Sequence, residues 1–578
     1  MPDPENPLIV QGDKSILLEV NNPKYEDARN LISRFAELLK SPEYIHTYHI
    51  TNLSLWNAAA AGMSAGLIIN ALETYSKYDV PGNVKTDISD TISRYGCLEM
   101  VKDRGSLLLK SEDSVLITEL WNHKKLSRLL VEQCDPHTIK VRAEQRGHIK
   151  QALTEIGYPV KDLAGYITGE FMPVDTLDIT GKGFPFGLRD YQREAVDSFY
   201  AGGDVRGGSG TIVLPCGAGK TIVGMGIMEK LKCNTLIITT NIIAARQWAD
   251  ELVDKTTLSQ DDIGEYSGEI KEIKPVTIAT YQILTYKTKK KKNNDTSEAK
   301  DSDEDNAEFP HFAIFNSRKW GLIIYDEVHL LPAPVFRITA ELQAMRRVGL
   351  TATLIREDGL EKKVFSLIGP KKYDAPWKEL EKQSWIAEAL CNEIRIPMED
   401  SQRMKYATAP YRSKYRVAAE NPLKLVTAKK IVEYHIARKN KILIVGMYLE
   451  QLRRIAKMFD APLLTGATSN RKRKELYDKY RSGEINLLVV SKVANFAIDL
   501  PDANVMVQVS GTFGSRQEEA QRLGRLLRPK KDGSVAHFYT IVTRDTRDQD
   551  FSSNRQMFLT ERGYKYEIGS EFKEPSSS

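Results

Sequence analysis

The 578-residue sequence predicts an α/β protein in which a mixed α/β N-terminal domain precedes two tandem parallel-sheet domains. From Gly187 onward, short apolar runs alternate with helical stretches, and polar or glycine-rich turns follow the runs. This alternation is typical of a parallel sheet wrapped by helices. A second set of such runs follows the first, and the length allows more than two domains. We place the domains at 1–175, 176–385 and 386–578.

The N-terminal domain reads as a mixture of short helices and strands, without a phosphate loop or a catalytic cluster. Apolar spacing and a stop at Ser41-Pro42 predict one helix, and a later stretch predicts two more. Two short apolar runs predict strands. The expected elements are a helix at Tyr25–Leu39, two helices within Leu53–Tyr78, and strands at Gly105–Leu109 and Ser114–Ile117.

Two histidines, His46 and His49, stand near each other in this domain. They alternate with Tyr44 and Tyr48, which fits a strand. A metal site would need a larger group of ligands, and the sequence offers none nearby. We therefore expect a strand here.

The strands of the two sheets are predicted from apolar runs of four to six residues. In the first parallel-sheet domain they are Thr211–Leu214, Thr235–Ile238, Val276–Ala279, Gly321–Tyr325 and Arg347–Leu350. In the second they are Lys441–Val445, Asn486–Val490, Val505–Val509 and Ala536–Ile541.

A low-complexity stretch at 287–308 interrupts the first of these domains. A basic run, Lys289–Lys292, is followed by acidic residues between Asp301 and Asp305, and apolar residues are scarce. We interpret it as a disordered, solvated insertion, with a basic DNA-touching arm as the alternative.

Composition sets broad limits on function. The net charge of +5 is too small to establish a nucleic-acid partner, although a local basic groove remains compatible with it. The five cysteines form no C-x-x-C pair, which disfavours a zinc ribbon and fits a reducing compartment. We find neither a secretory signal nor an apolar run of membrane-spanning length, and expect a cytoplasmic protein.

The strongest motif is Leu214-Pro-Cys-Gly-Ala-Gly-Lys-Thr221, between a predicted strand and the helix predicted at Ile222–Leu231. Backbone N–H groups of such a loop close around phosphate oxygens, and the helix start adds positive potential. Lys220 is expected to reach the β- and γ-phosphates, and the Thr221 hydroxyl to bind Mg²⁺. The loop candidates are Pro215, Cys216, Gly217, Ala218, Gly219, Lys220 and Thr221.

A second motif, Tyr325-Asp-Glu-Val-His329, ends the strand at Gly321–Tyr325. Adjacent carboxylates at a strand end repel each other unless a cation is present. Asp326 is the candidate for holding Mg²⁺, and Glu327 for polarising the attacking water. We expect His329 to hydrogen-bond across the cleft between the two domains.

A third motif, Gln521-Arg-Leu-Gly-Arg-Leu-Leu-Arg528, lies in the second parallel-sheet domain. Arg525 and Arg528 are three residues apart and project from one face of a helix. Such arginines can neutralise the charge that develops on the γ-phosphate, which makes both of them catalytic candidates.

These motifs together resemble superfamily 2 helicases, whose two motor domains are RecA-like. Weaker matches follow in the same order along the chain. Arg189 and Gln192 resemble the adenine-reading motif, and Thr351 and Thr353 resemble the motif that couples hydrolysis to movement, in which we include His329 and Gln521. The matches for nucleic-acid contact are Thr239, Arg246-Gln-Trp248, Thr280, Tyr281, Ser491 and Lys492, and Asp499 is assigned to nucleotide binding.

The resemblance narrows to the XPB family of DNA repair helicases. Arg356-Glu-Asp358 follows Thr351-Ala-Thr353, as in that family, and the block Gly514–Arg525 also looks like XPB. The phrase Asn6–Lys14 and the run His46–His49 look like its bacterial branch.

The resemblance implies an ATP- and Mg²⁺-dependent DNA helicase of 3′-to-5′ polarity in nucleotide excision repair. It assigns strand separation to Arg356, Glu357 and Asp358 and damage recognition to the N-terminal domain. It implies DNA as partner, with a repair nuclease as a further candidate. A thumb-like segment is expected at Asp400–Glu420, where basic residues alternate with Tyr406, Tyr411 and Tyr415; a solvated helix face is an equal alternative.

Three other functions stay open at this stage. A double-strand translocase would share every ATPase residue with a helicase. A nucleotide-dependent switch is disfavoured by the complete catalytic set, and an RNA helicase by Asp326-Glu-Val-His329 in place of Asp-Glu-Ala-Asp.

Overall fold

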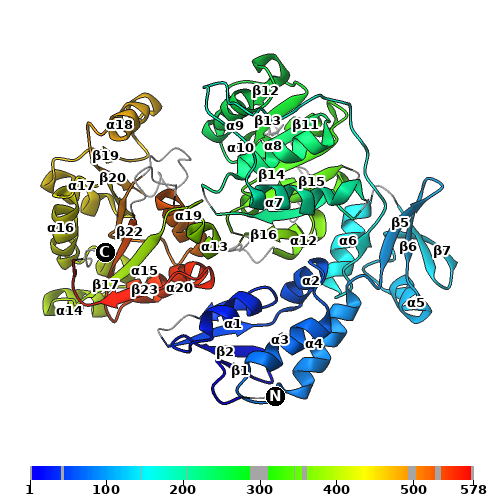
Figure 1. Ribbon diagram of the computed structural model, residues 1–578, viewed down its shortest axis with the longest axis horizontal. Helices are drawn as coiled ribbons and strands as arrows, with labels where there is room; N and C mark the ends of the chain where they lie inside the picture. Colours follow the sequence, from blue (N-terminus) through cyan, green and yellow to red (C-terminus); the bar gives the residue numbers. More distant parts are fainter. Residues whose placement is uncertain are drawn as a thin grey trace, which may run out of the picture.

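The computed structural model describes residues 3–40, 44–142, 145–204, 206–215, 217–286, 310–343, 345–353, 361–375, 377–491, 503–527 and 535–574. The two parallel-sheet domains stand beside each other, and the N-terminal region lies below and beside them in the view of Figure 1. The predicted fold class is confirmed by two parallel sheets and an N-terminal region of mixed structure.

The N-terminal region contains two separate sheets. The first is antiparallel, with strand order β1-β2-β4-β3, and carries helices α1 to α4. The second has the order β7-β8-β6-β5-β9 and carries α5 and α6. The first unit consists of β1 (Leu8–Val10), β2 (Ser15–Glu19), α1 (Tyr25–Ile32), β3 (Glu37–Lys40), β4 (Ile45–His49), α2 (Asn52–Ala60), α3 (Ala65–Tyr75) and α4 (Gly82–Arg94). The second consists of β5 (Glu99–Asp103), β6 (Ser106–Lys110), α5 (Ser114–Asn122), β7 (Leu130–Asp135), β8 (Thr138–Val141), α6 (Arg146–Glu155) and β9 (Lys161–Asp162).

The two parallel-sheet domains are called the first and second motor domains below, after the resemblance given above. The first is built on a parallel sheet of order β12-β13-β11-β14-β15-β10-β16. Its strands are β10 (Ser209–Val213), β11 (Thr235–Thr239), β12 (Ile263–Tyr266), β13 (Val276–Thr280), β14 (Leu322–Asp326), β15 (Arg346–Thr351) and β16 (Lys371–Asp374). Its helices are α7 (Asp190–Tyr200), α8 (Lys220–Leu231), α9 (Ile242–Lys255), α10 (Tyr281–Leu284), α11 (Ala333–Glu341), α12 (Glu361–Leu367) and α13 (Trp377–Lys382).

The second motor domain has a parallel sheet of order β19-β20-β18-β21-β22-β17-β23. Its strands are β17 (Ala389–Ile396), β18 (Ile442–Gly446), β19 (Leu463–Leu464), β20 (Leu487–Ser491), β21 (Val505–Gln508), β22 (Ala536–Thr543) and β23 (Tyr566–Gly569). Its helices are α14 (Asp400–Thr408), α15 (Tyr411–Ala419), α16 (Leu423–Ile436), α17 (Leu449–Met458), α18 (Asn470–Ser482), α19 (Arg516–Leu526) and α20 (Arg547–Glu561).

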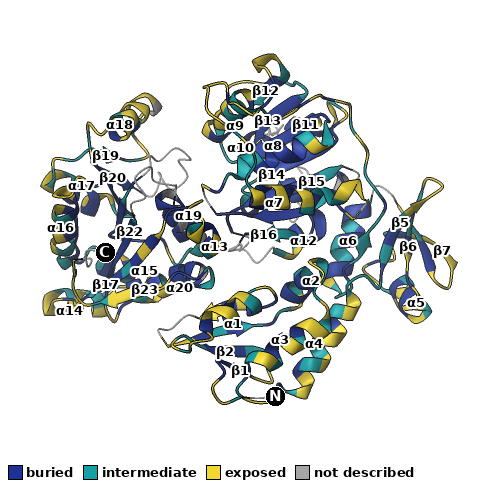
Figure 2. Cartoon of the chain, in the orientation of Figure 1, coloured by how far each residue is buried: buried dark blue, intermediate teal, exposed yellow. Residues whose placement is uncertain are grey.

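All nine strands predicted for the two motor domains are present. Helices cover both faces of each sheet, so strands such as β11 and β18 are buried along their whole length. Figure 2 shows most of the sheet strands in dark blue. A strand that is buried on both faces reads as a continuous apolar run, which explains why these strands were predictable.

Two predictions for the N-terminal domain are wrong. The helix expected at Tyr25–Leu39 ends at Ile32, because the chain then forms β3, which pairs with β4. Ser114–Ile117 is the start of helix α5 rather than a strand, because the Asp113 carboxylate caps the N–H groups of Val115 and Leu116.

The other N-terminal predictions are confirmed. Helices α2 (Asn52–Ala60) and α3 (Ala65–Tyr75) form where two helices were expected within Leu53–Tyr78, and β6 (Ser106–Lys110) forms where a strand was expected at Gly105–Leu109. His46 and His49 lie on β4, three residues apart, and therefore point to opposite faces of the strand. The predicted insertion at 287–308 lies outside the described residues.

In the ranges given above, no single helix combines the length and apolar character of a membrane span. Helices α2 and α3 meet these criteria only as a pair, and the pair is bent by 114°.

Candidate nucleotide site and nucleic-acid contacts

The candidate site forms where three neighbouring strands end. Strands β14, β15 and β10 are adjacent in the first sheet, and all are parallel. Their carboxyl ends therefore bring together the phosphate loop after β10, the carboxylates at the end of β14 and Thr351 at the end of β15. The backbone N–H of Leu214 also donates to the carbonyl of Thr351 at 2.9 Å, which fixes the start of the loop to β15.

The phosphate loop needs its glycines for steric reasons. Gly217 and Gly219 have φ angles of 85° and 83°, in the left-handed region that favours glycine. A Cβ atom on Gly219 would also lie 2.5 Å from Nε2 of Gln192. Helix α8 begins at Lys220, so the backbone N–H groups of its first turn face the phosphate loop. Such groups are donors for the oxygens of a bound phosphate.

The Gln192 side chain contacts the backbone of the phosphate loop. Its amide nitrogen donates to the carbonyl of Ala218 at 2.9 Å, and its amide oxygen accepts the backbone N–H of Arg189 at 2.9 Å. The Tyr191 hydroxyl donates to the same Ala218 carbonyl at 2.7 Å. The Gln192 side chain thus bonds backbone groups of Ala218 in the loop and of Arg189 in this structure, and its adenine-reading role stays a prediction.

Arg189 joins this region to the segment between the two motor domains. Its guanidinium lies 4.3 Å from the centre of the Trp385 ring, a cation–π distance. Its predicted nucleotide contact is untested.

Lys220 and Glu327 form an ion pair across the site. Nζ of Lys220 lies 3.0 Å from Oε1 of Glu327, and both side chains are largely buried. Glu327 has a φ of 50°, which is strained for a residue other than glycine. The lysine ammonium is therefore already in place at the mouth of the phosphate loop, with a carboxylate as its partner.

Asp326 is held by two donors. The indole N–H of Trp248 donates to its Oδ2 at 2.9 Å, and the N–H of Glu327 donates to its Oδ1 at 3.1 Å. Burial, reinforced by the Glu327 carboxylate, raises the pKa of Asp326 to about 6, although Lys220 opposes the shift. A divalent cation would relieve this repulsion, so the carboxylate and the Thr221 hydroxyl fit a Mg²⁺ site by their chemistry.

His329 and Thr351 form a buried link behind the carboxylates. Nδ1 of His329 lies 2.6 Å from Oγ1 of Thr351, and the Thr351 hydroxyl donates to the carbonyl of Thr353 at 2.5 Å. His329 is also 3.4 Å from Glu327. Nδ1 of His329 therefore bonds within its own domain, to a residue of β15, and the expected bond of His329 across the cleft stays a prediction. The chain runs from Glu327 through His329 and Thr351 to Thr353.

The predicted nucleic-acid contacts differ in their surroundings. Thr239 and Thr280 are buried at the ends of β11 and β13, and Thr280 caps α10. Tyr281 is also buried, and its hydroxyl donates to the backbone carbonyl of Asp326 at 3.0 Å. Arg246 is half exposed and pairs with Glu265 at 3.0 Å and with Glu269. The DNA contacts assigned to these residues stay predictions.

Two hydroxyls border segments that the structure does not describe. Thr353 Oγ1 and Ser491 Oγ are buried and make no hydrogen bond to any described residue. The remaining predicted residues are Cys216, Arg356, Glu357, Asp358, Lys492, Asp499 and Arg528, which lie outside the described residues, and Gln521 and Arg525, whose side chains do.

The thumb-like segment forms a helical hairpin of α14 and α15. Lys414 lies 5.3 Å from the Tyr406 ring, and Arg547 lies 4.0 Å from the exposed ring of Tyr411. Tyr415 does not belong with these exposed aromatics, because it is buried and packs against Phe513 and Phe551. The prediction that Tyr415 is available for stacking with DNA is therefore wrong.

Trp248 is a functional candidate that sequence reasoning did not single out. Although it lay inside the matched stretch Arg246-Gln-Trp248, its bond to Asp326 was not foreseen. A buried tryptophan usually donates its indole N–H to an acceptor. The signal in the sequence was therefore the tryptophan at position 248 itself.

The Thr351 link leads to a first test. Thr351→Val keeps the shape of the side chain but removes the hydroxyl between His329 and Thr353. Loss of one buried hydrogen bond, roughly 1 kcal/mol, should lower the coupling of hydrolysis to movement by about fivefold. We expect fewer DNA strands displaced per ATP hydrolysed, with Thr118→Val on the exposed face of α5 as control. An unchanged number of strands displaced per ATP would show that the Thr351 hydroxyl is not needed for this coupling.

Comparison with known proteins gives three matching family models. ERCC3/RAD25/XPB C-terminal helicase matches residues 380–578, type III restriction enzyme res subunit matches 185–356, and helicase conserved C-terminal domain matches 8–135.

Curated relatives match over almost the whole chain. The "DNA 3′-5′ helicase XPB" of Mycobacterium tuberculosis is 52% identical over 98% of this chain and 98% of its own length. The protein of the same name from Kineococcus radiotolerans is 50% identical over 98% of this chain and 96% of its own. The "General transcription and DNA repair factor IIH helicase/translocase subunit XPB" of Enterocytozoon bieneusi is 31% identical over 97% and 92%.

Proposed function

Because this chain belongs to the XPB family of helicases, we propose that it is an ATP-dependent 3′-5′ DNA helicase that acts in DNA repair of the nucleotide excision type. Its substrate is DNA, duplex or junction, inside the cell, and a repair nuclease is a candidate partner. The ion pair of Lys220 with Glu327, at 3.0 Å where β10 and β14 end, carries the proposal. It sets a phosphate-binding cation and a catalytic base side by side.

The residues of the first motor domain bind and activate the nucleotide. The loop from Pro215 to Thr221 cradles the phosphates through its backbone, and Lys220 exchanges Glu327 for phosphate oxygens when ATP binds. Thr221 and Asp326 would hold Mg²⁺, which would supply positive charge to neutralise the phosphates. Glu327, once released by Lys220, accepts the proton of the attacking water.

The second motor domain completes the site. Helix α19 carries Gln521 and Arg525 and, with Arg528 just beyond it, supplies arginines that stabilise the charge developing on the γ-phosphate. Asp499 contributes to nucleotide binding from the same domain.

Hydrolysis is coupled to movement through the chain from Glu327 to Thr353. His329 responds to the position of the Glu327 carboxylate, and Thr351 transmits the resulting movement to the end of β15. Thr353 precedes Arg356-Glu-Asp358, to which we assign strand separation. Backbone contacts with DNA come from the strand ends near Thr239, Thr280 and Ser491 and from Arg246 and Lys492, and they carry no sequence reading.

ATPase and strand displacement measured together test the proposal. We expect ATP hydrolysis to be stimulated by DNA and a 3′-tailed duplex to be unwound in preference to a 5′-tailed one. Forked and blunt duplexes complete the set. Stimulated hydrolysis without displacement would instead establish a double-strand translocase. Nucleotide-dependent DNA binding without any hydrolysis would establish a switch, and either result would contradict the helicase assignment.

A further inference from the structure

The first residue of α19 is held by the N-terminal region. Nη1 of Arg516 donates to the backbone carbonyl of Leu38 in β3 at 3.3 Å, and its Nη2 lies 3.2 Å from the sulfur of Met557 in α20. Met557 itself packs into the hydrophobic core of the first N-terminal sheet unit. The helix that carries Gln521 and Arg525 therefore starts at a contact with another domain.

Two further contacts join the same surfaces. Arg29 of α1 packs against Gly563, where a Cβ atom would lie 2.6 Å from the guanidinium. Gly563 also has a φ of 91°, so a side chain is excluded both by space and by backbone conformation. Nζ of Lys565 lies 5.3 Å from the centre of the Tyr25 ring.

The same N-terminal unit also contacts the first motor domain. Oδ1 of Asn57 in α2 accepts the backbone N–H of Lys371 at 3.0 Å, at the first residue of β16. The ring of Trp56 packs against Phe365 of α12 with a centroid distance of 6.2 Å. The N-terminal unit therefore contacts both motor domains.

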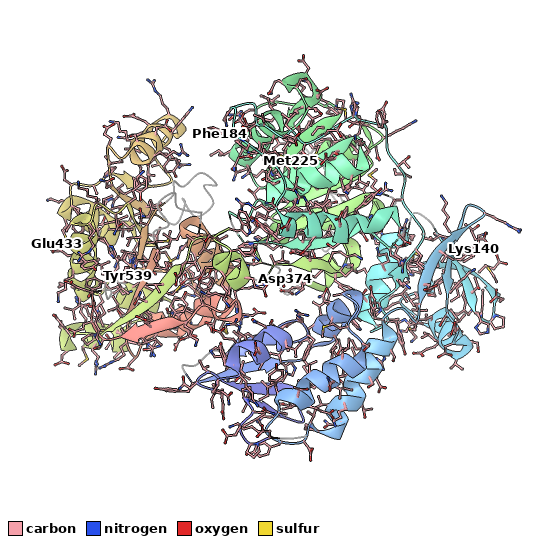
Figure 3. All side chains as sticks on the ribbon, in the orientation of Figure 1. Lys140, Phe184, Met225, Asp374, Glu433 and Tyr539 are labelled. Atoms are coloured by element: carbon pink, nitrogen blue, oxygen red, sulfur yellow. The ribbon has the colours of Figure 1, made fainter. Side chains whose placement is uncertain are left out.

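An ion pair then joins the two motor domains to each other. Nη1 of Arg562 lies 2.5 Å from Oδ1 of Asp374, and Lys371 lies 2.8 Å from the other oxygen. Figure 3 labels Asp374 near the centre of the view, where the two motor domains and the N-terminal unit meet. Burial would raise the pKa of Asp374, but Arg562 and Lys371 lower it to about 2. The carboxylate is therefore charged at neutral pH.

These contacts lie around a cavity and do not form one continuous interface. A cavity of about 1440 Å³ lies between the three domains. Six charged side chains that line it form what we term the junction cluster: Glu37, Lys371, Asp374, Arg516, Glu561 and Arg562. Three are cations and three are carboxylates, and each domain supplies at least one. The junction cluster therefore lies at the cavity where the three domains meet.

We infer that the first N-terminal sheet unit is a brace that positions α19 against the nucleotide site, with Arg516 as the positioning residue and the junction cluster as its anchor. The inference rests on the proposed ATPase function, since the position of α19 matters only if its arginines act on the nucleotide. Arg516 does not touch the nucleotide itself. It sets the start of the helix from which the catalytic arginine projects.

Arg516→Gln tests the brace by activity. We expect the kcat for DNA-stimulated ATP hydrolysis to fall about 10- to 100-fold, because a displacement of about 1 Å can cost that much. The KM for ATP should change less than about twofold, because most of the assigned nucleotide-binding residues lie in the first motor domain. Arg516→Lys can still donate to the Leu38 carbonyl and should recover part of the rate. Arg544→Gln, which removes an exposed arginine beside Asp545 in the same domain, is the matched control.

Hydrogen–deuterium exchange on the same full-length variants tests the brace without ATP hydrolysis. Arg516→Gln should increase exchange both in 516–526 and across the interface in 37–40, whereas Arg544→Gln should change neither. Unchanged exchange in 37–40 would overturn the brace. Increased exchange with an unchanged kcat would overturn the positioning role. A wild-type protein without DNA-stimulated hydrolysis would instead refute the proposed function, and the exchange result would still decide whether the brace exists.

Discussion

Replacing Glu327 with glutamine is expected to reduce ATP turnover about 10²- to 10⁴-fold, the range for loss of a general base. The amide has the shape of the carboxylate but cannot take a proton from water. Because the neutral amide binds Lys220 more weakly than the Glu327 carboxylate does, phosphate oxygens meet less competition for the ammonium, and nucleotide binding should be kept or strengthened. The expected signature is therefore a large loss in kcat with a KM for ATP that is equal or lower.

Single-turnover hydrolysis and nucleotide binding should be measured on the same Glu327→Gln preparation. Glu251→Gln is the matched control, since it makes the same change on α9 of the same domain, where Glu251 pairs only with Lys255 among the ion pairs of the described residues. Turnover within about tenfold of the wild type would exclude Glu327 as the base.

Lys220→Ala should also stop turnover, but by a different route. In the proposed mechanism, the ammonium at the start of α8 contacts phosphates both in the bound nucleotide and as charge develops during transfer. Loss of one such electrostatic contact costs about 10²- to 10³-fold in rate, and nucleotide affinity should fall as well. Lys220→Ala should thus lower kcat and raise the Kd for ATP, whereas Glu327→Gln lowers kcat alone.

The control for this variant is Lys230→Ala. Lys230 lies on the same helix, and its partner is the exposed Asp197 at 3.5 Å. Circular dichroism should show an intact fold in both variants, and DNA binding without nucleotide should be retained. If Lys220→Ala hydrolysed ATP at the wild-type rate, the loop from Pro215 to Thr221 would not be the nucleotide site.

The motor domains were predictable because their sequence signals are local. Buried parallel strands such as β18 and β20 are nearly continuous apolar runs, and the phosphate loop follows β10 directly. The position of Asp326 followed from its place directly after the strand predicted at Gly321–Tyr325.

The contacts that the sequence did not reveal are those between distant segments. Nothing near His329 indicates that its partner is Thr351, 22 residues away on another strand. Helical spacing continued through Leu38, yet β3 forms there because β4 is available for pairing. The contact of Arg516 with Leu38 spans 478 residues and depends wholly on tertiary packing.

The left-handed backbone of Glu327 has a cost for the protein as a whole. A side-chain-bearing residue in this conformation is destabilised by roughly 1–3 kcal/mol, and the surrounding sheet must supply that energy. Replacing Glu327 with a residue that relieves this strain would make the domain more resistant to heat. The same replacement would remove the proposed base beside the phosphate loop. If Glu327 is the base as proposed, stability and turnover place opposite demands on one residue, and selection for thermal tolerance alone would act against its carboxylate.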